Sequence, residues 1–157
     1  MQFLLAGPLG ISPKAAESFP PNIKLLGRVT RDQLVQCYRQ AHVFVFPTLS
    51  DGFGVTQPEA MAQALPVITT PNCANVITHG VDGLIIPARD NQSLVNAIAK
   101  FDGDRELLRE LSANALQTVQ KYKIPANGLA IQHQVAQFRN CENGGAGVTT
   151  AVNHSGL

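Results

Sequence analysis

Short apolar runs alternate with segments of helical periodicity, and this alternation constrains the fold of the chain more than any other feature. The apolar runs cover residues 2–6, 23–26, 43–46, 66–69 and 83–86. Strands that alternate with helices are typical of a parallel sheet, because each parallel connection needs a crossover. We therefore expect an α/β fold, a Rossmann-like parallel sheet flanked by helices, in a domain that spans residues 1–140.

Capping residues mark where the helices begin. Thr30 and Gln33 form a capping box with Thr30 at the N-cap, and Asp90 is suited to cap a later helix. The helical spacing predicts helices that begin near residues 31, 57, 91, 105 and 129. Residues 141–157 contain a Gly-Gly-Ala-Gly run and little that could pack. We expect this tail to be disordered or foreign to the domain.

Charge and cysteine content exclude several classes of function. Twelve Lys and Arg against eleven Asp and Glu give a net charge of +1, so no field of one sign favours nucleic-acid binding. The three cysteines are odd in number and form no CxxC pair, which argues against a disulfide framework and a structural zinc site. The first apolar run is too short for a signal peptide, and no segment approaches the length of a membrane span. We expect a cytoplasmic protein, at most peripheral at a membrane.

The stretch PTLSDGFGVTQPEA, residues 47–60, carries most of the functional information. It follows a buried strand, contains two glycines and leads into a helix. In a doubly wound sheet, ligands bind beyond the carboxyl ends of the strands. Glycines there let the backbone approach a ligand, and the first N–H groups of the next helix suit an anion.

Two carboxylates, Asp51 and Glu59, frame this loop. Each can accept two hydroxyl hydrogen bonds, so the pair suits ribose and sugar hydroxyls. Carboxylates repel a diphosphate, which must then be met by N–H groups or basic side chains. A structural interpretation stays open at this point: Thr56 and Glu59 also form a capping box, and Asp51-Gly52 is an ordinary turn signal.

The run SDGFGVTQPEAMAQALPVI, residues 50–68, closely resembles the donor-site signature of glycosyltransferase family 4. In that signature an acidic residue, Gly-Phe-Gly and a second acidic residue recur at this spacing. Other segments resemble the family in the same order: LAGP at 5–8, LGRV at 26–29, FVFP at 44–47, PVI at 66–68 and GVDGL at 80–84. The resemblance covers roughly residues 2–122.

The resemblance implies the C-terminal, donor-binding half of a GT-B glycosyltransferase. Such a domain binds a UDP-, GDP- or ADP-sugar, needs no metal or other cofactor, and transfers a hexosyl unit with retention of configuration in carbohydrate biosynthesis. It implies a catalytic pair in which Asp51 contacts the transferred sugar and Glu59 binds the ribose. The donor-binding set it implies is Gly7, Arg28, Val29, Gly52, Phe53, Gly54, Val55, Thr56 and Glu59.

The chain also departs from the family pattern. Family members have one more strand and helix before the position where this chain starts, and these supply an arginine and a lysine for the diphosphate. The N-terminal domain that holds a glycan, lipid or small-molecule acceptor is absent as well. Where the family tends to carry a glycine, this chain has Cys73-Ala74-Asn75, and we expect Cys73 to be a passive thiol.

These observations leave three hypotheses. The chain is the donor domain of a hexosyltransferase, inactive without its acceptor domain; or a nucleotide- or sugar-binding regulatory module of the same fold; or a fragment that binds nothing. The acidic pair favours the first two. A sheet without its first strand would also expose a bare edge, from which we expect self-association.

Overall fold

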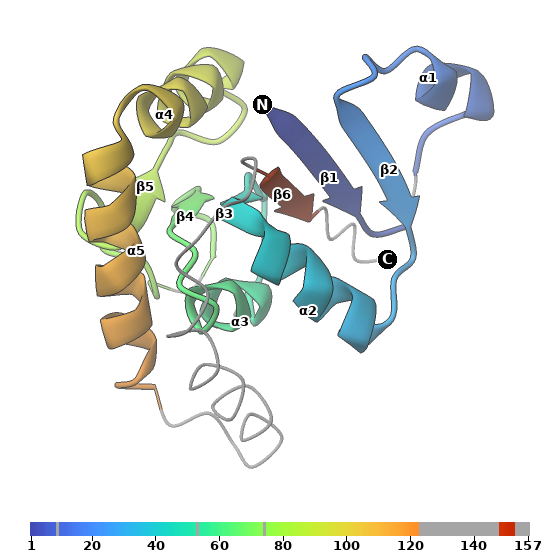
Figure 1. Cartoon of the computed structure of the whole chain (residues 1–157). Coiled ribbons are helices and arrows are strands. Elements are labelled where there is room, and N and C mark those ends of the chain that lie inside the picture. Colours follow the sequence, from blue (N-terminus) through green and yellow to red (C-terminus); the bar gives the residue numbers. More distant parts are fainter. Residues whose placement is uncertain (9, 53, 74, 123–147, 153–157) are drawn as a thin grey trace.

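The structure is a computed structural model that describes residues 1–8, 10–52, 54–73 and 75–122, and the backbone of residues 148–152. Figure 1 shows a sheet with helices around it. The helices are α1 (Pro13–Glu17), α2 (Arg31–Gln40), α3 (Thr56–Met61), α4 (Asn91–Gly103) and α5 (Arg105–Val119); the strands are β1 (Gln2–Ala6), β2 (Ile23–Gly27), β3 (Ala41–Phe46), β4 (Val67–Thr69), β5 (Gly83–Ile85) and β6 (Val148–Val152). The predicted α/β class is confirmed.

The sheet has the strand order β2-β1-β6-β3-β4-β5, and every described strand pair is parallel. From β1 the chain steps outward to β2, whereas from β3 it steps outward to β4 and β5 on the other side. This reversal is the topological switch point of a doubly wound sheet. The loops that follow β1 and β3 therefore border the crevice in which ligands of this fold bind.

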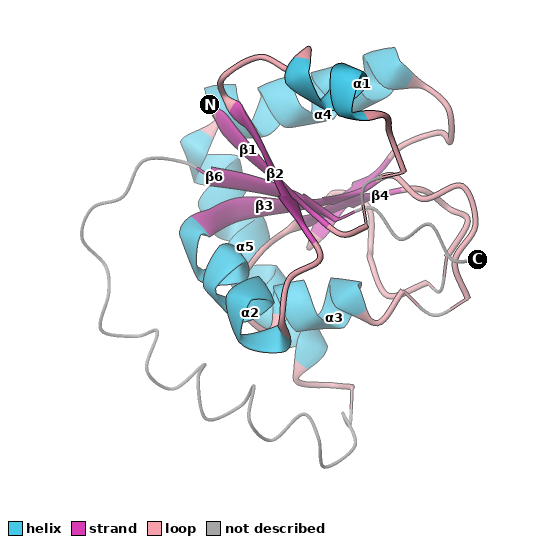
Figure 2. Ribbon diagram, turned by 90° about the vertical axis from the view of Figure 1, so that its right-hand side faces the viewer, coloured by secondary structure: helices cyan, strands magenta, loops and turns pink. Residues whose placement is uncertain are grey.

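Helices cover both faces of the sheet. Figure 2 shows α2 and α3 on one face and α1 and α4 on the other. Strand β3 serves both layers, because successive side chains of a strand point to opposite faces. Phe44 and Phe46 pack into the cluster on the α2–α3 face. Val43 and Val45 pack into the cluster on the α4 face. All four side chains are buried, which fixes the register of the strand that leads into the loop at residues 47–55.

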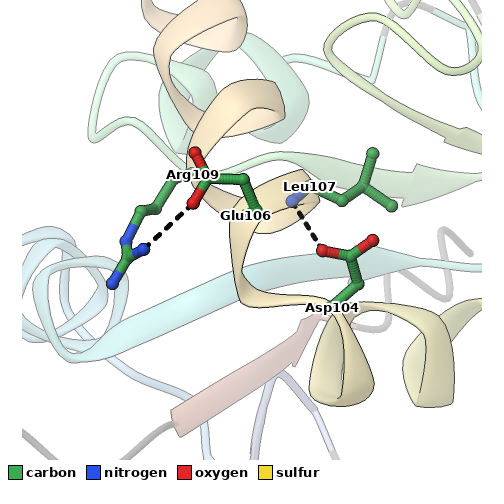
Figure 3. Close-up of polar contacts among 4 residues, drawn as sticks. All are labelled: Asp104, Glu106, Leu107 and Arg109. Carbon is green, nitrogen blue, oxygen red and sulfur yellow. Dashed lines mark hydrogen bonds and ion pairs between the residues drawn. The ribbon is translucent and has the colours of Figure 1, made fainter.

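The predicted helix starts at Thr30 and Asp90 are confirmed. Thr30 accepts from the N–H of Gln33, whose side chain accepts from the N–H of Thr30, so the capping box is complete. Asp90 caps α4 by accepting from the N–H of Ser93. Figure 3 shows the start of α5, where Asp104 accepts from the N–H of Leu107 at 2.9 Å. In the same view an exposed pair, Arg109 and Glu106, lies 3.2 Å apart.

Strand β6 corrects two predictions. It lies between β1 and β3 and pairs with both, in the place that the first strand holds in a doubly wound sheet. The expectation that the whole tail 141–157 stands apart from the domain is therefore wrong for Val148–Val152. The expected bare edge beside β1 is also absent, since β1 has a partner on each side, and self-association stays a hypothesis without that support. Residues 141–147 and 153–157, and the helix expected at 129–138, lie outside the described residues.

Candidate donor site

The loop after β3 is attached to the segment after β4 by three hydrogen bonds. The hydroxyl of Thr70 donates to the carbonyl of Thr48 at 2.6 Å. The amide of Asn72 donates to the carbonyl of Leu49 at 2.9 Å, and the N–H of Asp51 donates to the carbonyl of Asn72 at 3.0 Å. Because parallel strands end at the same edge of a sheet, these contacts bring two strand ends together into one wall.

Asp51 shapes the turn that follows it. One carboxylate oxygen, Oδ1, accepts from the N–H of Gly54 at 2.6 Å. Gly54 has φ of 60°, a conformation that glycine adopts without strain, and a Cβ there would collide with the side-chain nitrogen Nε2 of Gln57. The second carboxylate oxygen of Asp51 accepts no hydrogen bond from any described residue. Asp51 is half-buried, so this oxygen is the part of the side chain that can bind a hydroxyl.

The first turn of α3 does not contain the capping box that the sequence left open as an alternative role for Glu59. The N-cap of α3 is Val55, which is helical and has no side-chain cap, so the capping box between Thr56 and Glu59 is not formed. Thr56 is instead buried inside the helix, and its hydroxyl has no hydrogen-bond partner among the described residues. The carboxylate of Glu59 therefore does not form a capping box, while its place in the first turn of α3 still lets it interact favourably with the helix dipole.

Glu59 projects from α3 toward the start of α2. Its Oε1 lies 3.9 Å from a guanidinium nitrogen of Arg31, and the Glu59 side chain is 25% exposed. Burial raises the pKa of Glu59, and the positive charge of Arg31 offsets part of that increase. The pKa of Tyr38 on α2 is also raised, mainly by burial and to a smaller extent by the charge of Glu59. The hydroxyl of Tyr38 has no hydrogen-bond partner in the described part of the chain. The protein thus holds a carboxylate in a place that disfavours its charge, as binding sites commonly do.

Gly7, Arg28 and Val29 lie at the ends of β1 and β2. The N–H of Gly7 donates to the carbonyl of Gly27 at 2.8 Å, which joins the two strand ends, and Gly7 has φ of 141°. Arg28 is exposed, and Val29 packs against the cluster on the α2–α3 face. This second group of predicted residues therefore lies directly before α2, the helix that carries Arg31.

The structure places the predicted residues in two groups, one at the β1–β2 ends and one after β3, and Arg31 beside the first group lies 3.9 Å from Glu59 of the second. Gly52 and Val55 are exposed in the second group, whereas Gly54 is buried and its N–H, expected to meet a ligand, donates to Asp51. Phe53 lies outside the described residues. Three residues that make contacts here could not be singled out from the sequence, because their neighbours are distant in the chain: Arg31, Gln57 and Asn72.

A cavity of about 570 Å³ lies elsewhere, at the amino ends of β1 and β3. Gln2, His42 and Arg105 are among its lining residues. Since ligands of doubly wound sheets bind at the carboxyl ends, this cavity is not part of the candidate site. Among the residues that the structure describes, no three His, Cys, Asp or Glu side chains gather as a metal site requires. No helix in the described part of the chain is long and apolar enough to cross a membrane.

Solved structures share this fold. Sucrose-phosphate synthase from Thermosynechococcus elongatus superposes with a TM-score of 0.67 and 27% identity, over 88% of this chain and 37% of that one. HepE from Anabaena, solved with UDP-glucose, superposes with a TM-score of 0.62 and 17% identity, over 88% of this chain and 48% of that one. The fold is that of part of a GT-B glycosyltransferase, the class to which these solved structures belong.

Residues 1–104 match the family described as Glycosyl transferases group 1, and the chain belongs to that family. A curated relative, the lipopolysaccharide core biosynthesis mannosyltransferase LpsB of Rhizobium meliloti, is 42% identical over 88 residues. That alignment covers 54% of this chain and 25% of LpsB. The chain therefore spans about a quarter of the length of this relative.

The raised pKa of Glu59 gives a testable dependence of stability on pH. Because burial makes the folded protein hold this proton more tightly than the unfolded chain does, ionisation of Glu59 lowers the stability of the fold. The loss of stability begins as the pH rises through the ordinary pKa of 4.5 and is complete above the raised pKa of Glu59 in the folded protein. We expect Glu59→Gln to be more stable than the wild type at pH 7 and equally stable at acidic pH, measured by urea unfolding. A pH-independent difference would contradict this cause.

Proposed function

We propose that this chain is the donor-binding domain of a retaining glycosyltransferase of family 4. It binds a nucleoside-diphosphate sugar and presents the hexosyl unit to an acceptor held by a second domain. The observation that carries the proposal is Glu59, a partly buried carboxylate that forms no capping box and whose pKa is raised by burial. A carboxylate in such surroundings suits a ligand rich in hydroxyls, for which ribose is the candidate.

The proposal assigns the remaining roles to Asp51 and to the start of α3. The free oxygen of Asp51 accepts from a sugar hydroxyl, while its other oxygen keeps the turn closed on Gly54. The N–H groups of Val55 and Thr56, at the start of α3, face the diphosphate. Stabilising the charge of the departing diphosphate is the main electrostatic task in such a transfer, and in this proposal no metal takes part. The similarity to HepE, which was solved with UDP-glucose, supports the assignment of the ligand class.

A second candidate is a binding module of the same fold that holds a nucleotide sugar without turning it over. The feature that favours it is the small number of cations at this edge of the sheet. Arg28 and Arg31 follow the end of β2 and Arg89 follows the end of β5, and Arg31 already lies beside Glu59. We propose that transfer requires cations and an acceptor site supplied by a further domain. The expected location is the cytoplasm, at the membrane face where the acceptor is a lipid.

Ligand-dependent thermal unfolding tests the proposal. The wild type, Glu59→Ala and Glu106→Ala would be heated with millimolar UDP-glucose, GDP-mannose or ADP-glucose. A ligand at a hundred times its Kd adds roughly 2.7 kcal/mol of stability. We expect one nucleotide class to stabilise the wild type and Glu106→Ala, in which only an exposed side chain is removed. Glu59→Ala should lose that stabilisation.

The outcomes separate the candidates. Stabilisation of the wild type that survives in Glu59→Ala would contradict the assigned ribose site. Stabilisation that depends on Glu59, without sugar transfer after an acceptor domain is joined, would favour the binding module. No stabilisation by any of the three ligands would overturn donor binding by this chain.

A further inference from the structure

Gln57 lies between the two segments that wall the candidate donor site. One segment is the turn from Asp51 to Gly54, and the other is Asn72 and Cys73 after β4. The side chain of Gln57 is completely buried, although it is polar and occupies the first turn of a short helix. A buried amide is stable only where it makes hydrogen bonds, so its partners indicate what it does.

Gln57 contacts both segments. Its backbone N–H donates to the carbonyl of Gly54 at 2.8 Å. Its side-chain nitrogen Nε2 donates to the sulfur of Cys73 at 3.3 Å. The absence of a side chain at Gly54 leaves room for this amide, because a Cβ there would collide with Nε2. Gln57 therefore adds a side-chain link between the turn and the segment after β4, beside the backbone hydrogen bond from Asp51 to Asn72.

The thiol of Cys73 is held from three directions. Besides Gln57, it lies 3.3 Å from the hydroxyl of Thr69, and it donates to the carbonyl of Thr70 at 3.3 Å. Thr69 and Thr70 belong to the end of β4 and the residue after it, and Thr69 also donates to the carbonyl of Phe46 at the end of β3. The contact of Gln57 with Cys73 thus connects the turn to the ends of two central strands.

The carboxamide of Gln57 is less favourable for stability in this buried space than an apolar side chain would be. Its oxygen Oε1 is buried and has no hydrogen-bond partner among the described residues. A polar atom that is buried without a partner destabilises a fold, whereas an apolar side chain of the same length does not. The described contact that needs an amide at this position is the hydrogen bond from Nε2 to Cys73, which indicates a role in arranging the site.

We propose that Gln57 is a positioning residue for the sugar portion of the donor. It holds the Asp51–Gly54 turn and the Asn72–Cys73 segment at one separation, so that the free oxygen of Asp51 faces the sugar hydroxyls. The inference rests on the proposed function. It requires that loss of the amide weaken binding of a nucleotide sugar more than binding of the nucleoside diphosphate alone, because Glu59 is left intact.

The test combines ligand binding with the reactivity of Cys73. All proteins would carry Cys141→Ser, and Cys37 is buried, with a pKa that burial raises, so Cys73 is the thiol that N-ethylmaleimide reaches first. Gln57→Met removes the amide and keeps the length of the side chain. Gln63→Met is the matched control, because Gln63 is also buried with an unpaired oxygen but makes no contact with either wall in the described structure. Calorimetry would compare the binding of each nucleoside diphosphate with that of its sugar conjugate: UDP with UDP-glucose, GDP with GDP-mannose, and ADP with ADP-glucose.

We expect Gln57→Met to raise the alkylation rate of Cys73 several-fold and to weaken nucleotide-sugar binding about tenfold, with binding of the diphosphate changed less than twofold. Cys73→Ala removes the same hydrogen bond from the other side and should give the same binding pattern, which covers the case that Gln57→Met fails to fold. Equal losses for diphosphate and sugar, or no loss, would overturn the positioning role. Binding of none of these ligands by the wild type would instead overturn the proposed function, while the alkylation rate still reports whether Gln57 holds Cys73.

Discussion

Phe44→Ala is expected to destabilise the protein by about 3–5 kcal/mol, because truncation of a buried aromatic side chain leaves a cavity. Phe44 is fully buried at the centre of the cluster on the α2–α3 face. Its ring packs edge-on against Tyr38 with centroids 5.6 Å apart, and it stacks on Phe46 at 5.9 Å. A loss of this size is a large part of the stability of a typical domain and should lower the Tm by about 10 °C or more.

Phe19→Ala provides the control for this prediction. Phe19 is the same residue type but is 37% exposed and belongs to neither core cluster. Its removal should change the free energy of unfolding by about 0.5 kcal/mol or less. Equal effects of the two substitutions in chemical denaturation would show that the side chain of Phe44 is not at the centre of the core.

Thr150→Pro is expected to lower the free energy of unfolding by about 2–4 kcal/mol, because proline removes a backbone N–H that a central strand needs. Thr150 pairs with Leu4 of β1 on one side and with Phe44 of β3 on the other. Proline is tolerated in edge strands and at strand starts, and Thr150 is at neither kind of position. Urea unfolding at constant pH measures the effect.

Thr150→Ala separates the backbone from the side chain. It keeps the N–H and the trans peptide geometry, so the ladder of β6 stays intact and the stability should change by less than about 1 kcal/mol. If Thr150→Pro were as stable as Thr150→Ala, the strand position of residues 148–152 would be refuted. The earlier expectation of a tail outside the domain would then stand.

The described strands β1 to β5 could be predicted from the sequence because each is a short apolar run bounded by a glycine, proline or polar loop. The helix starts at Thr30 and Asp90 were predictable for a local reason, since a capping residue acts within three positions of itself. Helix α1 was missed because it is one short turn with no buried residue, so it carries no apolar periodicity. Strand β6 was missed because its neighbours in the sheet are far away in sequence, and the glycines before it are typical of a tail.

The candidate site was predictable to the extent that its residues are neighbours in the chain. Asp51, Gly54 and Glu59 lie within one loop and one helical turn, so a single motif contains them. The contacts of Arg31 with Glu59 and of Gln57 with Cys73 depend on how α2, α3 and the end of β4 pack together. No local pattern reports such packing. The capping box predicted between Thr56 and Glu59 does not form for a local reason. The turn at Gly54 starts the helix one residue earlier than the motif requires.

The position of β6 also has a consequence for how the chain acquires its fold during synthesis. The strand that β1 and β3 share as a neighbour, β6, follows β3 by about a hundred residues, which at 5–20 residues per second is a delay of roughly 5–20 s. Until then β1 with β2, and β3 with β4 and β5, are separate pieces whose inner edges have no partner. Such a topology has a high contact order and folds slowly. In that interval those two edges are the places where a nascent chain of this protein is open to pairing with a wrong strand.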